Sequence, residues 1–545
     1  MMRHIQSMYP SEDGNREARY ELLGLFETVL TELDQLKDPN KMTLGAEPDL
    51  SSNYYQNIIN EAVIPEKGFG TRKTVEELVK LAEGHRFLNR HYVANATPLP
   101  NNASIVGNLL MVLLNGNNLW DVDGTAAAKT EVQITSMMSD IVGYDKQKSG
   151  GFTTWGGQGA VFQSLRLAIA AACPEANQKG IPQHLYAFCS ELSHFSLYKS
   201  MEATGIGTDH LVRVKTNRDH SMDLTDLREK MKVVIESGGL PVYILATLGT
   251  TDTFGIDDLS GIKQITDEIK TTYDLPHIYI HADSAMGGMY SFFNKYNFEE
   301  NPLYFENEVL EVLSHYKSRF QELRHADSLA FDFHKLGQTP YTTSLFLIKD
   351  RTALQAVDLD SQETPYVGNR GFGSYHTSYT LECSRMGSSI PIYASLIALG
   401  VEGYQEILAN YIRVSLAFRQ KLTEAFPNVA VTNEVAPVTT FRFYPKGIRY
   451  ADEINGNMTE KEIREINSYN EKIAETLGRY RGQTYFGSTK KQRYVYPKDS
   501  QSPVPLYVEK FYCVSPYTTL DVLDDYIDFL KTHIHSSDLI MWETK

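Results

Sequence analysis

Cysteine is scarce in this sequence and widely spread. The four cysteines, Cys173, Cys189, Cys383 and Cys513, have neither the paired spacing of a zinc site nor the density of a small disulfide-linked domain. We therefore expect reduced thiols, no metal centre and a cytoplasmic location.

Long hydrophobic runs and a basic excess are also missing. The longest apolar run, around 105–114, is too short to span a bilayer, and residues 1–14 lack the continuous apolar segment of a signal peptide. The 52 basic residues are outnumbered by 68 acidic ones, giving a formal charge of -16. This balance argues against broad binding to nucleic acid or to an anionic membrane. We expect a soluble protein without either partner.

The sequence does contain enough apolar material for a large core, since 42% of its 545 residues are hydrophobic. Between about residues 105 and 350, short β-like runs alternate with helical patterns. The strand candidates are 185–189, 211–214, 242–246, 278–281, 329–331 and 345–348. This alternation predicts an α/β domain with a mainly parallel sheet, whose ligands gather at the carboxyl ends of the strands.

Different patterns flank this region. Helical spacing predicts an amphipathic helix over 17–36, which needs a partner surface, and another over 75–88, with irregular chain between them. After about residue 390, helical runs surround β-like stretches: 390–426, 461–477 and 520–533 are helical, 439–444 and 507–514 are β-like, and 478–505 resembles a long loop. We expect a helical segment over 1–104, a large domain over 105–389 and a small α+β domain over 390–545.

The stretch from Ser328 to Tyr341 contains a lysine at an unusual position. A short apolar run predicts a buried strand, and Lys335 follows its end, with His334 before it and a glycine after it. A buried lysine must be paired, neutralised or joined to a carbonyl cofactor. The alternative is a lysine that extends from the strand end into water.

Three other predicted strand ends carry groups that suit a flat ligand. His194 could stack on an aromatic ring, Thr251 offers a hydroxyl, and Asp283 ends an apolar strand close to the small Ala285. A buried carboxylate at Asp283 needs a cationic partner. Each residue alone is also compatible with an ordinary structural role.

A glycine-rich stretch over 150–159 runs directly into an apolar helical pattern over 160–172. Small residues at a helix start let unpaired N–H groups approach a phosphate, and the helix dipole favours its negative charge. The stretch lacks both the dinucleotide-binding and the P-loop spacings. This possible phosphate site is accompanied by Asp283, which could pair with a pyridine nitrogen, and by Lys335, which could join an aldehyde. The three features together predict a site for pyridoxal 5'-phosphate (PLP).

Four motifs together resemble those of the group II PLP-dependent amino-acid decarboxylases: Asp332-x-His334-Lys335, His281-x-Asp283-x-Ala285-x-Gly287-Gly288, Ser190-x-x-x-His194-x-Ser196 and Gly249-Thr250-Thr251. The resemblance covers roughly Arg90 to the C-terminus. It is nearest to the bacterial tyrosine decarboxylases through 115–118, the insert after the aspartate motif, Pro340-Tyr341 and 379–385. It implies a fold-type I architecture with a mainly parallel seven-stranded sheet, and a homodimer with shared active sites.

The resemblance also implies roles for individual residues. Lys335 would join the cofactor aldehyde, Asp283 would pair with the pyridine nitrogen, His194 would stack on the ring, and Thr251 would lie near the ring hydroxyl. The other implied cofactor contacts are Ala285, His334, Gly157, Gln158, Ser384 and Arg385. Ser384 and Arg385 match a turn that approaches the cofactor phosphate from the partner subunit.

Some positions depart from the family pattern. Gln158 stands where relatives have a small hydroxyl residue, so the backbone of Gly157 and Gln158 provides the predicted phosphate contacts, and Phe333 replaces the usual proline before His334. In this family a tyrosine on a loop after the lysine strand returns a proton to Cα. Tyr366 is the nearest match and Tyr375 the second choice.

The resemblance implies decarboxylation of an L-amino acid to its amine and carbon dioxide. Tyr92, Asn95 and Thr97 match a family loop that contacts substrate, and Lys510 lies near a position where relatives place a carboxylate-binding arginine. The tyrosine branch favours an aromatic substrate.

Other readings of the same residues stay open. Arg370, Arg385 and Lys510 would equally suit an acidic side chain such as that of glutamate or aspartate. A PLP-dependent carbon–carbon lyase or oxidative deaminase uses the same scaffold. The non-enzymatic alternative is a catalytically silent dimeric scaffold, although such a protein has no need of a buried lysine and aspartate.

Overall fold

The computed structural model describes residues 5–48, 50–360, 362–364 and 375–534. Tyr366 and Arg370 therefore lie outside the described residues. The chain forms two compact units, one of residues 1–93 with 475–486 and the other of residues 94–474 with 487–545. The domain boundaries predicted at 104 and 389 stay a prediction.

The first unit contains the helices α2 (Arg16–Leu36), α3 (Tyr54–Glu61) and α4 (Thr71–Lys80). Asn15 caps α2 by accepting a hydrogen bond from the Ala18 N–H at 2.9 Å. The helix predicted over 17–36 is confirmed. The helix predicted over 75–88 begins earlier and ends at Lys80, and the region expected to be irregular contains α3. In the same unit β1 (Tyr92–Val93) pairs with Tyr485 and Phe486.

A seven-stranded sheet forms the centre of the second unit, in the order β2-β8-β7-β6-β5-β3-β4. Its strands are β2 (Gly150–Thr154), β3 (Leu185–Ser190), β4 (Leu211–Val214), β5 (Leu240–Thr247), β6 (Tyr279–Asp283), β7 (Ser328–Asp332) and β8 (Ser344–Ile348). β8 is antiparallel to both of its neighbours, whereas the pairs from β7 across to β4 are parallel. The mainly parallel seven-stranded sheet is confirmed.

The strand β2 was not predicted from the sequence, because its two glycines are typical of a turn rather than of a strand. Packing explains the glycine at position 151, because a Cβ there would lie 2.5 Å from the Phe346 carbonyl oxygen of β8. The turn is therefore confined to Trp155 and Gly156, and α7 (Gly157–Ala172) begins directly after it.

Helices surround the sheet in the second unit: α5 (Asn102–Leu114), α6 (Thr125–Val142), α7, α8 (Ala176–Lys179), α9 (Ser196–Thr204), α10 (Leu224–Glu236), α11 (Leu259–Tyr273) and α12 (Asn307–Phe320). The apolar side of α7 packs on alternate strand residues such as Ala187, Leu245 and Phe346. The intervening residue Ile244 is also fully buried. Burial on both faces explains the continuous apolar runs of these strands.

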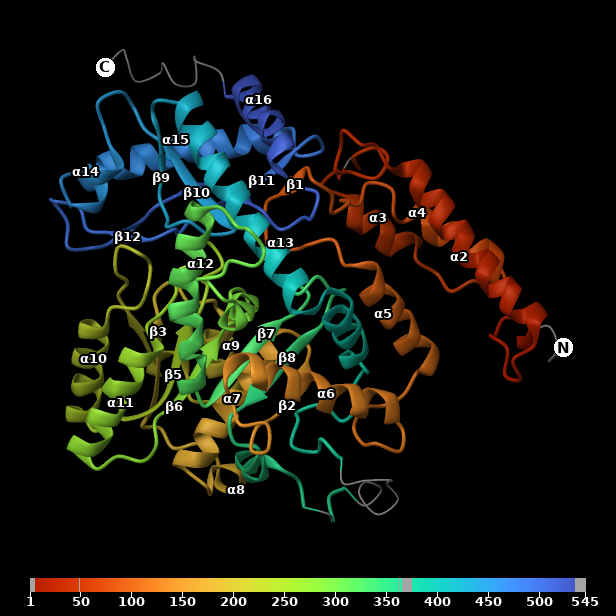
Figure 1. The fold of residues 1–545 in the computed structure, drawn as a ribbon, viewed down its shortest axis with the longest axis horizontal. Coiled ribbons are helices and arrows are strands. Elements are labelled where there is room, and N and C mark those ends of the chain that lie inside the picture. The colour runs from red at the N-terminus through yellow and green to blue at the C-terminus, as the bar shows by residue number, and fades with distance from the viewer. Residues whose placement is uncertain (1–4, 49, 361, 365–374, 535–545) are drawn as a thin grey trace. The chain divides into compact units, whose positions relative to one another are not determined.

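A smaller antiparallel sheet in the second unit contains β9 (Val429–Val431), β10 (Val438–Phe443), β14 (Val508–Tyr512) and the Gly487–Thr489 part of β11 (Tyr485–Thr489). It is accompanied by α13 (Ser389–Ala425), α14 (Tyr450–Ile454), α15 (Glu460–Arg479) and α16 (Leu523–His533). Figure 1 shows α13 running from the large sheet to this smaller one, and α13 contacts α5, α6, β9 and β10.

The three helices predicted after residue 390 are confirmed to within a few residues. The long loop predicted over 478–505 is wrong, because it contains β11 and the short pair β12 (Tyr494–Val495) and β13 (Val504–Pro505). Mixed Lys, Pro and Tyr conceal the alternation of such short strands. Among the described residues, no helix is long and apolar enough to cross a membrane.

Candidate active site

The predicted site residues follow adjacent parallel strands. The order β7-β6-β5-β3 places the carboxyl ends of these four strands at one edge of the sheet, and Asp283 pairs with both Thr247 and Ala330 in register. Asp332 ends β7, Asp283 ends β6, and His194 lies in the turn after β3. The topology therefore brings together residues that are more than 130 positions apart in the chain.

Lys335 lies on the turn after β7 and forms an ion pair with Asp332. Its Nζ atom is 2.8 Å from Asp332 Oδ2, and Ser344 Oγ of β8 donates to Asp332 Oδ1 at 2.6 Å. Burial opposes the charged form of Lys335, but the Asp332 carboxylate outweighs it and raises the pKa of Lys335. Burial likewise opposes the Asp332 carboxylate, but Lys335 and His334 outweigh it and lower the pKa of Asp332.

Asp283 is buried and forms no ion pair among the described residues. Its described hydrogen bond comes from the Ala285 N–H, at 3.3 Å from Oδ1. Burial raises the pKa of Asp283 even though Lys335 and His194 favour its charged form. A protonated heterocycle of a ligand would supply the missing hydrogen bond and charge.

One ring nitrogen of His194 accepts a hydrogen bond from the backbone. The Ser196 N–H donates to its Nδ1 at 3.2 Å, so a neutral ring carries its proton on Nε2. The ring lies 4.1 Å from that of Phe195, measured between centroids. Burial lowers the pKa of His194, opposed by the charge of Asp283. Burial therefore favours the neutral imidazole, whose proton is then on Nε2.

The start of α7 lies against the same carboxylates. A Cβ on Gly157 would be 3.2 Å from the Ala285 Cβ and 3.3 Å from both Asp332 oxygens. The cap residue Gly156 has no side chain to occupy the first N–H groups of this 16-residue helix. Gln158 Nε2 instead donates to Ser196 O at 3.2 Å and to Ser200 Oγ at 3.0 Å, joining α7 to α9. The start of α7, which has no side-chain cap, thus lies beside the Asp332 carboxylate that pairs with Lys335.

Two of the predicted cations already have partners elsewhere. Lys510 Nζ lies 2.7 Å from Asp252 Oδ1. The Arg385 guanidinium is buried and donates to both carboxylate oxygens of Glu131, at 3.1 and 2.7 Å, and to the carbonyl oxygens of Asn118 and Thr153. Within the part of the chain that the structure describes, neither side chain forms a hydrogen bond or ion pair with Lys335, Asp332 or Asp283.

Other predicted residues are placed as follows. The carbonyl oxygen of Thr251 accepts from the Tyr512 hydroxyl at 2.9 Å, and Ser384 is exposed. Asn95 and Thr97 interact locally, through the Thr97 N–H and the Asn95 carbonyl oxygen at 2.9 Å. Tyr92 belongs to the first unit, where it is buried and contacts Arg86 and Tyr485.

The Tyr375 hydroxyl donates to the Glu131 carboxylate, and burial raises the pKa of this phenol. This engagement makes Tyr375 a poor acid for a ligand in its own subunit. Tyr366 lies outside the described residues.

Sequence reasoning assigned no site role to Asp332 or Tyr341, which the structure places next to Lys335 and His334. The ring of Tyr341 lies 4.2 Å from that of His334, measured between centroids, and its side chain is exposed. For Asp332 the signal was available, because a carboxylate three residues before a lysine on a turn is placed to form an ion pair. For Tyr341 no spacing rule gives the contact.

The donor set fits PLP. Asp283 matches a pyridine nitrogen, the uncapped start of α7 matches a phosphate, Lys335 matches an aldehyde, and His194 offers a flat neutral ring. The buried Ser196 Oγ has no described partner. No element of this set requires a metal ion.

Comparison with known proteins points the same way. A sequence-family model described as "Pyridoxal-dependent decarboxylase conserved domain" matches residues 74–303 and 309–444. The L-2,4-diaminobutyrate decarboxylase of Acinetobacter baumannii is 24% identical over 423 residues, covering 72% of this chain and 76% of that protein. The aromatic-L-amino-acid decarboxylase of Bacillus atrophaeus is 22% identical over 437 residues, covering 76% and 80%.

A solved structure shares the fold. The crystal structure of Oryza sativa TDC with PLP and tryptamine superposes with a TM-score of 0.75 at 15% identity, covering 96% of this chain and 99% of that one. At this identity the likeness concerns the fold alone.

Proposed function

The chain belongs to the pyridoxal-dependent decarboxylase family and is a PLP-dependent amino-acid decarboxylase, and from this premise we propose that its substrate is an L-amino acid with an aromatic, tyrosine-like side chain. The observation that carries this choice is that Lys510 and Arg385, which could have bound an acidic side chain, are already paired with Asp252 and Glu131. Together with the tyrosine-branch motifs, these pairs favour an aromatic over an acidic substrate.

We assign the cofactor contacts as follows. When bound, PLP supplies a protonated pyridine ring that accepts the electron pair left on Cα as carbon dioxide departs. Asp283 would hold the ring nitrogen protonated, because its buried carboxylate would gain a cation there. His194 would stack on the ring, and the N–H groups at the start of α7 would hold the phosphate.

Asp332 positions Lys335 for its covalent role. The 2.8 Å ion pair and the hydrogen bond from Ser344 fix the direction of the ammonium and keep it protonated until a ligand replaces that contact. Tyr366 is proposed to return the proton to Cα, and we expect Tyr366→Phe to keep the cofactor while slowing turnover or increasing side products. Unchanged turnover and product ratio would remove Tyr366 from the mechanism.

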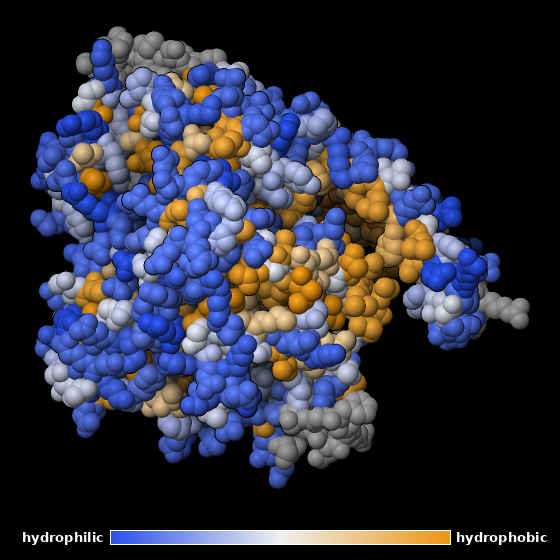
Figure 2. All heavy atoms as spheres, viewed as in Figure 1, coloured by the Kyte–Doolittle hydropathy of each residue, from blue (hydrophilic) through white to orange (hydrophobic). Residues whose placement is uncertain are grey.

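The subunit arrangement is proposed to be a homodimer that shares its active sites. Helix α5 supports this, since Val106, Leu110 and Leu113 are 62%, 47% and 52% exposed. Figure 2 shows the resulting hydrophobic surface right of centre. Sedimentation should show a dimer that Val106→Lys with Leu113→Lys dissociates, whereas Val233→Lys, on the exposed side of α10, leaves it intact.

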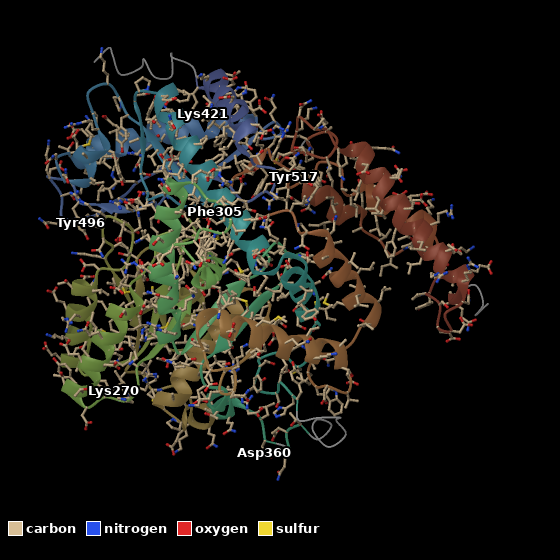
Figure 3. The ribbon with its side chains drawn as sticks, viewed as in Figure 1. Lys270, Phe305, Asp360, Lys421, Tyr496 and Tyr517 are labelled. Carbon is tan, nitrogen blue, oxygen red and sulfur yellow. The ribbon has the colours of Figure 1, made fainter. Side chains whose placement is uncertain are left out.

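The direct test offers the twenty amino acids to the holoenzyme and measures amine, carbon dioxide and oxygen uptake. Amine with equal carbon dioxide and greatest turnover of tyrosine supports the proposal. An aldehyde with oxygen uptake, or preference for glutamate or aspartate, would overturn it. Lys335→Ala should abolish the visible absorption band of bound cofactor, whereas Lys270→Ala, at an exposed site on α11 (Figure 3), should keep it.

A further inference from the structure

Asp252 forms an ion pair with the buried Lys510. Its Oδ1 is 2.7 Å from Lys510 Nζ, and Thr489 Oγ1 donates to its Oδ2 at 2.8 Å. The side chain of Lys510 is 7% exposed and that of Asp252 is 31% exposed. The exposed member of the pair is therefore the acid, and each of its oxygens keeps acceptor capacity beyond one hydrogen bond.

Asp252 lies at the same edge of the large sheet as Lys335. It follows Thr251 in the turn after β5, and β14 holds this turn at both residues, through Lys510 and through the hydroxyl of Tyr512. Burial lowers the pKa of His194 and the charge of Lys335 lowers it further, whereas the charges of Asp283, Asp332 and Asp252 oppose this effect. Because β5 lies between β6 and β3 in the sheet, the turn that carries Asp252 lies between the strand end at Asp283 and the turn that carries His194.

We propose that Asp252 determines substrate specificity: its carboxylate accepts a hydrogen bond from a donor at the end of the substrate side chain and disfavours a side chain that ends in a carboxylate. This inference rests on the proposed decarboxylase function and names the chemistry of the substrate end. The donor is a phenolic hydroxyl or an ammonium group. An acidic side chain meets the like charge of Asp252, because the charge of Lys510 is already compensated.

The size of the effect distinguishes this contact from ordinary packing. A hydrophobic pocket discriminates one small group by about 10–200-fold, whereas a site that hydrogen-bonds a substrate hydroxyl rejects the analogue without it more strongly. The informative substrates are pairs that differ by the donor: tyrosine against phenylalanine, and 2,4-diaminobutyrate against 2-aminobutyrate. The first pair tests the phenol and the second the ammonium.

The experiment compares holoenzyme of wild type, Asp252→Asn and the double variant Asp252→Asn with Lys510→Met. Two readouts are kcat/KM for amine formation and the dissociation constant from titration of the visible cofactor spectrum. The double variant guards against misfolding, because it leaves no buried lysine uncompensated. Asp524→Asn is the charge-matched control, since Asp524 forms an equally short pair with Lys421 at 2.7 Å on the surface (Figure 3).

We expect wild type to favour the donor-bearing member of at least one pair by clearly more than about 200-fold, and the double variant to fall back into the range of about 10–200-fold or less that packing alone gives. Asp252→Asn should gain affinity for glutamate, since Lys510 is then uncompensated, and Lys510→Met should remove the gain. Wild type without preference in either pair, or a preference that survives in both variants, would overturn the role of Asp252. If no amino acid yields carbon dioxide, the proposed function fails, while the spectral dissociation constants still test Asp252.

Discussion

The Lys335 ammonium, on the turn that follows β7, lies 2.8 Å from the carboxylate of Asp332, the last residue of that strand. Ser344 of the neighbouring strand β8 donates to the other oxygen of the same carboxylate. The pair is therefore fixed by two adjacent strands of the sheet. Its effect is to keep a lysine charged at a depth where burial alone would favour the neutral amine.

Replacing Asp332 with asparagine should lower the pKa of Lys335, because burial then acts without the carboxylate that outweighs it. More of the lysine would be neutral at a given pH, and the neutral amine is the form that attacks an aldehyde. We expect the pH profile for the rate of PLP uptake, followed by visible absorbance, to move to lower pH. Ser344→Ala keeps the charge and should move the profile less. Identical profiles for Asp332→Asn and wild type would contradict this account.

We expect the buried carboxylate of Asp283 to destabilise the cofactor-free protein at neutral pH and to strengthen cofactor binding. Its pKa is raised by burial, so its contribution to stability is present below the unfolded-state pKa and is lost as the pH rises through the folded-state pKa. Asp283→Asn cannot ionise, and its cofactor-free form should be more stable than wild type at neutral pH by about 1 kcal/mol.

The measurement is thermal unfolding from pH 5 to 8 with and without PLP. Added PLP should stabilise wild type clearly more than Asp283→Asn, because the variant lacks the charge that pairs with the ring nitrogen. Equal stabilisation of the two proteins by PLP would separate Asp283 from the cofactor.

The sequence was most informative where local pattern and sheet topology agree. Strands ending at Asp283 and Asp332 could be predicted because apolar runs mark buried strands, and parallel strands bring their carboxyl ends to one edge. The ion-pair partners of arginine and lysine side chains could not be predicted in this way. Arg385 meets Glu131 across 254 positions and Lys510 meets Asp252 across 258, and neither spacing follows a local rule.

Gly157 has a specific packing role that alanine should disturb. Its added methyl group would lie 3.2 Å from the Ala285 Cβ and 3.3 Å from the Asp332 oxygens, closer than ordinary contact. We expect Gly157→Ala to fold but to bind PLP about tenfold or more weakly, because the start of α7 must move away from the carboxylates. Gly24→Ala in α2, where nothing lies within 4 Å of the new Cβ, is the control and should bind PLP normally. Fluorescence titration of the apoprotein with PLP gives both dissociation constants.

Glu131 and Arg385 should behave as a coupled structural pair. Both side chains are buried, and the carboxylate also accepts from the Thr153 N–H at 2.8 Å. Glu131→Gln keeps an acceptor for that N–H but leaves the guanidinium uncompensated, so we expect a loss of about 3–5 kcal/mol. In an Arg385→Met background the same substitution should cost much less, because no buried cation remains to be compensated.

Denaturant unfolding of wild type, Glu131→Gln, Arg385→Met and the double variant gives the coupling energy between the two side chains. PLP titration of the same four proteins distinguishes two possible roles for Arg385. A structural role predicts that folded Arg385→Met with Glu131→Gln binds PLP within about twofold of wild type. A contact to the cofactor phosphate, as the family resemblance implies, predicts a loss of about tenfold or more, because a charge-assisted hydrogen bond contributes about 1.5–3 kcal/mol. The bonds that Arg385 forms to Glu131, Asn118 and Thr153 within one chain favour the structural outcome.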